Sequence, residues 1–213
     1  MIITSVSNPK FNNRLLDRIL VAAESSKINP IIVINKIDLE DSEFYEEWYE
    51  LYNEIGYQVF LTSVTGNIGL FELKDRLMGN VNLFCGQSGV GKSSILNGLY
   101  PKLNLKVGDV SAVTQKGRHT TVSAVLKHVD NETVVIDTPG IREFAPYGIE
   151  KHDLAHYFIE FLPYINECKF NTCTHYHEPG CAVVEAVDNG EIDVQRYYSY
   201  LNLLETIEDE TVY

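Results

Sequence analysis

The sequence has no apolar run long enough to cross a bilayer, and its strongest apolar stretch, residues 30–34, suits a buried strand. Its first residues lack a basic segment followed by an apolar core, which is the pattern of a secretion signal. Internal repeats and low-complexity linkers are also missing. We therefore expect a cytoplasmic, globular protein with no membrane partner.

Basic residues are scarce, since 17 Lys and Arg stand against 30 Asp and Glu, for a net charge of −13. A broad nucleic-acid-binding face needs clustered Lys and Arg to displace counterions from phosphates, and this sequence excludes one. The acids concentrate in residues 40–54 and 205–210, as on a solvated helix face and a frayed end. Any contact with RNA must therefore be local.

Cysteine is rare too, but three of the four cysteines lie close together among histidines near the C-terminus. In a reducing cytosol such a cluster binds metal more often than it forms disulfides. The fourth, Cys85, stands alone in an apolar strand and is expected to be a small buried hydrophobe.

The length of 213 residues suits one α/β domain of ordinary size and a smaller appendage. Strands alternate with helices at first, which predicts a mostly parallel sheet covered on both faces, whereas only helices follow residue 150. We place the domains at 1–148 (α/β) and 149–213 (helical). The predicted strands are 2–6, 30–34, 57–61, 81–85, 122–129 and 133–136, and the predicted helices are 11–26, 42–55, 68–78, 93–99, 153–161, 183–187 and 194–207.

A glycine-rich turn with the pattern G-x-x-x-x-G-K-[ST] joins an apolar strand to a helix. Its glycines let successive N–H groups point at phosphate oxygens, and the helix N-terminus adds partial positive charge. Lys92 would reach the β- and γ-phosphates, and the Ser93 hydroxyl would ligate Mg²⁺. The nucleotide-binding residues expected in this phosphate loop are Gly86, Gln87, Ser88, Gly89, Val90, Gly91, Lys92, Ser93 and Ser94.

A second motif, D-T-P-G, begins at Asp137, at the carboxyl end of a predicted strand. An aspartate there holds the Mg²⁺ shell, and Gly140 could turn its N–H toward a γ-phosphate. Between the two motifs lies K-G-R-H-T-T, residues 116–121, where a threonine could complete the Mg²⁺ shell as part of a switch segment. Thr120 is the first choice and Thr121 the second.

The tetrapeptide N-K-x-D follows another strand and includes Asn35, Lys36 and Asp38. An aspartate in the base plane can accept from the N1–H and 2-amino group of guanine, whereas adenine offers an acceptor and no amino group there. Ser63, in the small-residue loop 62–66, could support the base from its other side. These residues predict guanine rather than adenine.

The order of the motifs is permuted, because N-K-x-D and the small-residue loop precede the phosphate loop, the switch and D-T-P-G. Surface termini can be rejoined in this way without disturbing a core. This order, with G-Q-S-G-V-G-K-S-S, G-R-H-T-T and a downstream Cys/His cluster, resembles the ribosome small-subunit-dependent GTPase A family (RsgA, YjeQ or EngC) over essentially the whole chain.

The resemblance implies a circularly permuted P-loop GTPase domain followed by a helical zinc-binding domain. It also implies GTP hydrolysis with Mg²⁺, and binding to the small ribosomal subunit and its rRNA late in assembly. Family members usually begin with an RNA-binding OB-fold domain, and this sequence starts about where that domain would end. We expect a monomer.

The sequence lacks a glutamine that Ras-type enzymes use in hydrolysis. In those enzymes the residue after D-x-x-G is a glutamine that orients the attacking water, whereas here it is Ile141. His119 resembles the histidine that the family is thought to use, and its imidazole could position or deprotonate water. The alternative is a surface histidine, and Arg118 and Arg142 could instead meet phosphate. Slow intrinsic turnover, dependent on a partner, is expected.

The Cys/His cluster supplies Cys168, Cys173, His175 and Cys181. Three thiolates and one imidazole form a closed tetrahedral set, typical of structural rather than catalytic zinc. His177 is a rival imidazole by spacing, and the family pattern matches His175. Two alternatives to the GTPase stay open: a GTP-dependent binding module with negligible turnover, and a P-loop kinase or ATPase.

Overall fold

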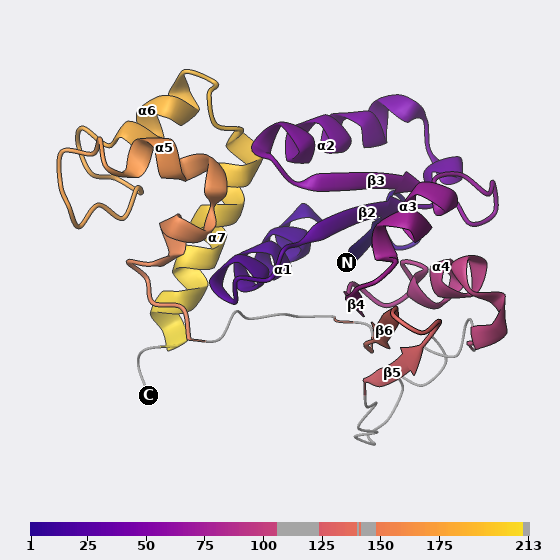
Figure 1. Ribbon diagram of the computed structural model, residues 1–213. Coiled ribbons are helices and arrows are strands. Elements are labelled where there is room, and N and C mark those ends of the chain that lie inside the picture. The colour runs from indigo at the N-terminus through magenta and orange to yellow at the C-terminus, as the bar shows by residue number, and fades with distance from the viewer. Residues whose placement is uncertain (106–123, 140, 142–147, 211–213) are drawn as a thin grey trace, which may run out of the picture. The chain divides into compact units, whose positions relative to one another are not determined.

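The computed structural model describes residues 1–105, 124–139, 141 and 148–210 (Figure 1). Contacts divide the chain into two compact units. Residues 1–12 and the described part of 30–141 form the first unit, and Asn13–Asn29 joins the described residues from Gly148 onward in the second. The segment 13–29 thus packs with the C-terminal part of the chain, while the contiguous domains 1–148 and 149–213 stay a prediction.

The first unit contains a mostly parallel sheet, as the sequence predicts. One set of strands runs parallel in the order β1-β2-β3, and a second has the order β4-β6-β5, with only β5 antiparallel. A parallel bridge between Ile2 and Cys85 joins β1 to β4, with the Ile3 N–H donating to the Cys85 carbonyl at 2.7 Å. The strands are β1 (Ile2–Ser5), β2 (Ile31–Asn35), β3 (Gln58–Thr62), β4 (Val81–Phe84), β5 (Val125–His128) and β6 (Val134–Asp137).

Two helices of the first unit pack on one face of this sheet. Side chains alternate between faces along a strand, so Ile3, Val33 and Phe84 point the same way and meet the apolar stripes of α3 and α4. Helix α3 follows the small-residue loop and α4 follows the phosphate loop, so this core fixes where those two loops end. The helical segments are η1 (Ile37–Leu39), α2 (Ser42–Ile55), α3 (Leu70–Leu77), α4 (Lys92–Leu99) and η2 (Pro101–Leu103).

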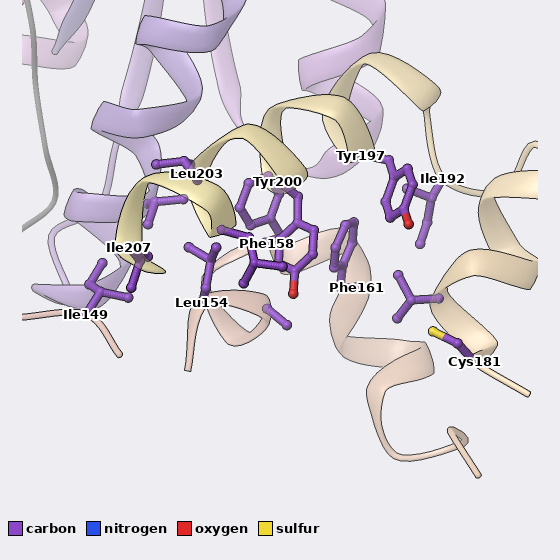
Figure 2. Close-up of a cluster of buried hydrophobic side chains, with 14 of the residues drawn as sticks. Ile149, Leu154, Phe158, Phe161, Cys181, Ile192, Tyr197, Tyr200, Leu203 and Ile207 are labelled. Carbon is purple, nitrogen blue, oxygen red and sulfur yellow. The ribbon is translucent and has the colours of Figure 1, made fainter. Parts of the chain in front are cut away.

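The second unit is helical and has its own core. Figure 2 shows Tyr200, Leu203 and Ile207 of α7 facing Phe158 and Leu154, and these five side chains are buried. No helix among the described residues is long and apolar enough to span a membrane. The helical segments are α1 (Asn13–Ser25), η3 (Leu154–Tyr157), η4 (Ile159–Phe161), α5 (Leu162–Ile165), α6 (Ala182–Asp188) and α7 (Val194–Glu210).

The single helix predicted over 153–161 is wrong. Two 3₁₀ turns replace it, because Phe158 between them takes an extended conformation with φ −100° and ψ 95°. The break lets Phe158 and Phe161 both enter the core, where their rings stack at 5.2 Å and each meets the edge or face of Tyr200. Tertiary packing of aromatic rings overrides the helical periodicity here.

A buried ionic network ties α1 to the rest of the second unit. Arg196 of α7 is 1% exposed and donates to Asp17 of α1, which is fully buried. Its Nε also donates to Glu160 Oε1 at 2.6 Å, and its guanidinium lies over the Phe158 ring, 4.7 Å from the centroid. The network explains how a helix from the N-terminal part of the sequence comes to belong to this unit.

Candidate functional site

The predicted guanine motif and the phosphate loop meet in space. Asn35 ends β2 and is 2% exposed, and its Nδ2 donates to the Val90 carbonyl of the phosphate loop at 2.9 Å. On its other side the Thr62 hydroxyl, at the end of β3, donates to Asn35 Oδ1 at 3.1 Å. Strands β2 and β3 are parallel, so their carboxyl ends carry both side chains to one edge of the sheet.

Lys36 makes a second link to the phosphate loop. Its backbone is left-handed, with φ 64°, and its ammonium donates to the Gly89 carbonyl at 2.8 Å and to the Asn8 carbonyl. Burial lowers the pKa of Lys36, and the nearby Asp38 carboxylate opposes that shift. The lysine stem is thus held between the turn at Asn8 and the phosphate loop.

Asp38 presents an exposed carboxylate from η1, two residues after Lys36. The Ser63 hydroxyl donates to Asp38 Oδ1, and Ser63 Oγ accepts from the Gly66 N–H at 2.8 Å. The small-residue loop therefore orients the carboxylate through a chain of hydrogen bonds and leaves acceptor positions free to face a ligand.

Two glycines of the phosphate loop allow these close contacts. A Cβ on Gly91 would lie 2.3 Å from Asn35 Nδ2, and one on Gly86 would lie 2.0 Å from the Ile3 carbonyl. Both residues have positive φ, 102° and 144°. The loop therefore requires glycine there for space as well as for conformation.

The cation and the acid of the predicted phosphate site lie at the base of the loop. Lys92 is buried, donates to the Gly86 and Gln87 carbonyls at 2.9 and 3.0 Å, and has a pKa lowered by burial, against the opposing charge of Asp137. Burial raises the pKa of Asp137, although Lys92 and a hydrogen bond from Ser93 oppose the shift. Among the described residues, Asp137 Oδ1 is buried without a hydrogen-bond partner.

Three predicted site residues, His119, Thr120 and Gly140, lie outside the described residues, as do Arg118, Thr121 and Arg142. Their roles stay predictions. The remaining predicted residues of the loop, Ser88 and Ser94, are half-buried beside the residues described above.

The predicted metal ligands converge at the other site. Ligand atoms of Cys168, Cys173, His175 and Cys181 all lie within 4.8 Å of one another. The Cys168 and Cys181 sulfurs are 3.9 Å apart, and His175 Nδ1 lies 3.5 and 3.4 Å from them. A tetrahedral zinc ion with ordinary bond lengths separates its ligands by roughly 3.5–3.8 Å, so the set fits zinc.

The protein around this set holds it in shape. His175 is 2% exposed and has φ 54°, and the Tyr197 hydroxyl donates to its carbonyl at 2.9 Å. Burial and the neighbouring thiols raise the pKa of Cys173 to about 12, a tendency that a bound cation reverses. His177, the rival imidazole, is exposed and outside the convergent group.

Glu178 organises the loop between these ligands. Its carboxylate accepts from the Thr174 N–H and hydroxyl and from the Tyr176 and His177 N–H groups. Burial opposes ionisation, but these hydrogen bonds outweigh it and lower the pKa of Glu178 to about 2. A single acid thus satisfies four donors of the metal loop.

Comparison with known proteins agrees with this geometry. The sequence profile of the RsgA GTPase family matches residues 1–146. The chain belongs to the RsgA GTPase family. Two curated relatives, both named small ribosomal subunit biogenesis GTPase RsgA, come from Chlorobaculum parvum (44% identity, 98% of this chain, 67% of the relative) and Vibrio vulnificus (41%, 97% and 60%).

Solved structures show the same fold for the RsgA family. A crystal structure of YjeQ from Thermotoga maritima has 36% identity, covers 97% of this chain and 69% of that chain, and aligns with a TM-score of 0.79. The structure of YloQ, described as a circularly permuted GTPase, has 32% identity, covers 98% of this chain and 68% of that chain, and aligns with a TM-score of 0.78. The chain spans about 60% of the length of the Vibrio relative.

Sequence reasoning missed part of this candidate site. The turn from Ser7 to Lys10 places the Asn8 carbonyl on Lys36 and the Pro9 ring beside Gly89. Thr62 also holds Asn35, although only its neighbour Ser63 was singled out. The Asn-Pro dipeptide just after a strand is a turn signal at the ligand-binding edge of a sheet, and could have pointed to the turn.

Proposed function

We propose that this chain binds guanine nucleotides with Mg²⁺ and hydrolyses GTP to GDP and phosphate. The observation that carries the proposal is the junction of the guanine motif with the phosphate loop, in which Asn35 and Lys36 hydrogen-bond to Val90 and Gly89. A base held by the first motif would therefore place its phosphates at the second.

Asp38 would read the base. Its exposed carboxylate can accept from the N1–H and the 2-amino group of guanine, while Ser63 fixes its orientation. Adenine presents a lone pair at the first position and no donor at the second, so it leaves the carboxylate facing an acceptor. A site built on such bonds rejects the analogue that lacks them strongly.

Lys92, Ser93 and Asp137 would hold the phosphates and their metal. The partnerless Asp137 Oδ1 and the nearby Ser93 hydroxyl are oxygen donors of the kind that Mg²⁺ prefers, and the buried Lys92 ammonium would offer its positive charge to the phosphates. When bound, Mg²⁺ would neutralise charge that develops on the phosphate oxygens. Lys92 would exchange its two loop carbonyls for phosphate oxygens.

Ile141 supports a second candidate, a GTP-dependent binding module with negligible turnover. Its N–H donates to the Gly86 carbonyl at 3.0 Å, and its half-buried side chain cannot hydrogen-bond to water. Hydrolysis would then depend on another group, for which His119 is the proposed catalytic residue, with Thr120 and Gly140 completing the γ-phosphate and Mg²⁺ contacts. A stimulating partner would supply the rest.

The Cys₃His set would hold a structural zinc, because all four positions are filled by protein ligands and none is left for water or substrate. The names of the relatives suggest the setting: this chain would act in late maturation of the small ribosomal subunit, in the cytoplasm, as a monomer. With a net charge of −13, its own rRNA contacts would be local.

Nucleotide titration tests the proposal. Labelled GDP should bind far more tightly than labelled ADP. Asp38→Asn should weaken GDP binding and relax the preference for GDP over ADP, because the amide presents a donor to the guanine N1–H. Asp41→Asn removes the same charge from an exposed residue nearby and should change neither affinity. Equal affinity of the unaltered chain for GDP and ADP would point to a P-loop kinase or ATPase instead.

Phosphate release then separates the two candidates. Release from GTP should be slow for the chain alone and faster with purified small ribosomal subunits. Release that stays negligible with and without subunits, alongside tight GDP binding, would favour the binding module.

A further inference from the structure

A turn that none of the predicted motifs includes is built into the guanine site. It spans Ser7 to Lys10, directly after β1, and its Asn8 carbonyl accepts a hydrogen bond from the Lys36 ammonium. The same ammonium donates to Gly89 of the phosphate loop at 2.8 Å. Lys36 is thus fixed from two sides, and one side is this turn.

The turn also touches the phosphate loop directly. A Cβ built on Gly89 would lie 3.5 Å from Pro9 Cδ, an ordinary van der Waals contact. The Ser5 hydroxyl, at the end of β1, donates to the Pro9 carbonyl at 2.8 Å, and the Phe11 N–H closes the turn on the Val6 carbonyl. The turn is therefore tied to the sheet, the guanine motif and the phosphate loop together.

The conformation of the turn depends on Asn8. Its φ is 50°, in the left-handed region that asparagine and glycine tolerate and alanine does not. Asn8 is exposed, so its side chain is not needed to fill a core. What Asn8 contributes is a backbone geometry that aims its carbonyl at Lys36.

We infer that the Ser7–Lys10 turn is a third positioning element of the nucleotide site, acting through Lys36. It holds the lysine stem where it can lie along a guanine base, and it sets the spacing between the base motif and the phosphate loop. The inference rests on the proposed function and adds residues to that same site. Asn8 is a positioning residue, since only Lys36 and the loop would contact nucleotide.

The chain carries a reporter for this turn. Trp48 is the single tryptophan, and its ring stacks on Phe11 at 4.7 Å between centroids, just beyond the turn. A change in the turn should therefore change the emission of Trp48, and so should GDP binding to the unaltered chain.

The test compares backbone-specific variants by GDP titration. Asn8→Ala should weaken GDP binding by roughly five-fold or more, because alanine resists the left-handed conformation. Asn8→Gly should restore binding relative to Asn8→Ala, because glycine accepts this φ. Lys27→Ala, an exposed change at the similar φ of 55° in the second unit, should leave GDP affinity unchanged.

A double-mutant cycle shows whether Asn8 acts through Lys36. On a Lys36→Met background, which keeps the stem and removes the ammonium, Asn8→Ala should weaken binding by less than about two-fold. The same loss with and without the ammonium would overturn the inference, as would equal GDP affinity of Asn8→Ala and the unaltered chain, or failure of Asn8→Gly to restore binding.

The proposed function can fail separately. If the unaltered chain binds no GDP, the guanine site itself is refuted and the inference falls with it. If the unaltered chain binds GDP and the Asn8 variants behave as it does, only the role of the turn is refuted. Trp48 emission on GDP addition, recorded in the same titration, should shift in the unaltered chain and shift less in Asn8→Ala.

Discussion

At the scale of single residues, the nucleotide site depends on how closely side chains from one motif approach the backbone of another. Asn35 reaches into the phosphate loop only because position 91 has no Cβ, and its amide then satisfies the Val90 carbonyl. The site is therefore sensitive to a single added methyl group at that point.

Gly91→Ala should abolish this approach. The new Cβ would lie 2.3 Å from Asn35 Nδ2 at a φ of 102°, so either Asn35 or the loop must move. We expect GDP affinity to fall about ten-fold or more, since a displacement of about 1 Å at a site has effects of that size. Isothermal titration with GDP measures the change.

Gly98→Ala is the matched control, because it adds the same methyl group within α4, the helix that directly follows Gly91. Its Cβ would meet side-chain ends alone, Leu70 Cδ1 at 3.3 Å and Val64 Cγ1 at 3.7 Å. GDP affinity should stay within about two-fold, and alanine should favour the helix. An unchanged affinity for Gly91→Ala would contradict the geometry described for Asn35.

Glu178 makes a prediction for the metal loop. Its folded pKa of about 2 lies below the ordinary 4.5, so its stabilisation is present above pH 4.5 and is lost as pH falls through about 2. Glu178→Gln should therefore speed zinc transfer to a chelator by the same factor at pH 7 and pH 5.5. Glu167→Gln, an exposed acid next to Cys168, should change the rate little. A factor that shrinks clearly at pH 5.5 would mean that the pKa of Glu178 is raised above the ordinary 4.5 rather than lowered.

At the scale of elements, sequence periodicity predicted most strands and helices because each lies in one continuous stretch with a regular pattern. Helix α2 has the predicted bounds, 42–55. The predicted strands of the first unit differ from the observed ones by a few residues at their ends, as far as the described residues show. The stretch 153–161 failed because the packing of Phe158 and Phe161 against Tyr200, far along the chain, decides its conformation. The pattern of a short stretch cannot indicate which distant residues will pack against it.

A buried ion pair joins helices α1 and α7. Arg196→Met removes the guanidinium from beside Asp17, a fully buried carboxylate, and from Glu160. We expect a loss of about 3–5 kcal/mol in the free energy of unfolding, the usual cost of breaking a buried ion pair from one side. Urea unfolding of the zinc-loaded chain, followed by helical circular dichroism, measures it.

Two comparisons make this prediction specific. Arg18→Met, on α1, removes a hydrogen bond to Thr206 at 2.8 Å in a half-buried position and should cost less, roughly 1–2 kcal/mol. The double change Asp17→Leu with Arg196→Met should recover part of the loss, because it removes the fully buried Asp17 carboxylate together with its partner and leaves only Glu160 without the guanidinium. Equal losses for Arg196→Met and Arg18→Met would mean that burial adds nothing to this network.

At the scale of the whole molecule, the sequence predicted the permuted fold and both clusters of site residues because each motif is short and recognisable by itself. That Asn35 and the phosphate loop meet follows from parallel strands that end at one edge of a sheet. The Ser7–Lys10 turn and the partners of α1 could not be predicted in the same way. The turn acts through a backbone carbonyl and α1 pairs with a single buried arginine, and neither contact has a recognisable sequence pattern.

The two compact units make a last prediction about metal removal. By contact, α1 belongs with the metal-bearing unit although it lies between β1 and β2 in the sequence. If zinc holds that unit together, chelation should unfold 148–210 and release α1 with it, while the sheet stays folded. Hydrogen exchange measured by mass spectrometry should then rise sharply in 13–25 and 194–207 and stay low in 31–35 and 58–62.

Cys181→Ser should give the same pattern without chelator, and Cys85→Ser, at the one cysteine outside the cluster, should not. Protection that persists in 13–25 after zinc loss would place α1 with the sheet, as contiguous domains at 1–148 and 149–213 require, and protection that persists in 194–207 would show that zinc is dispensable for the fold.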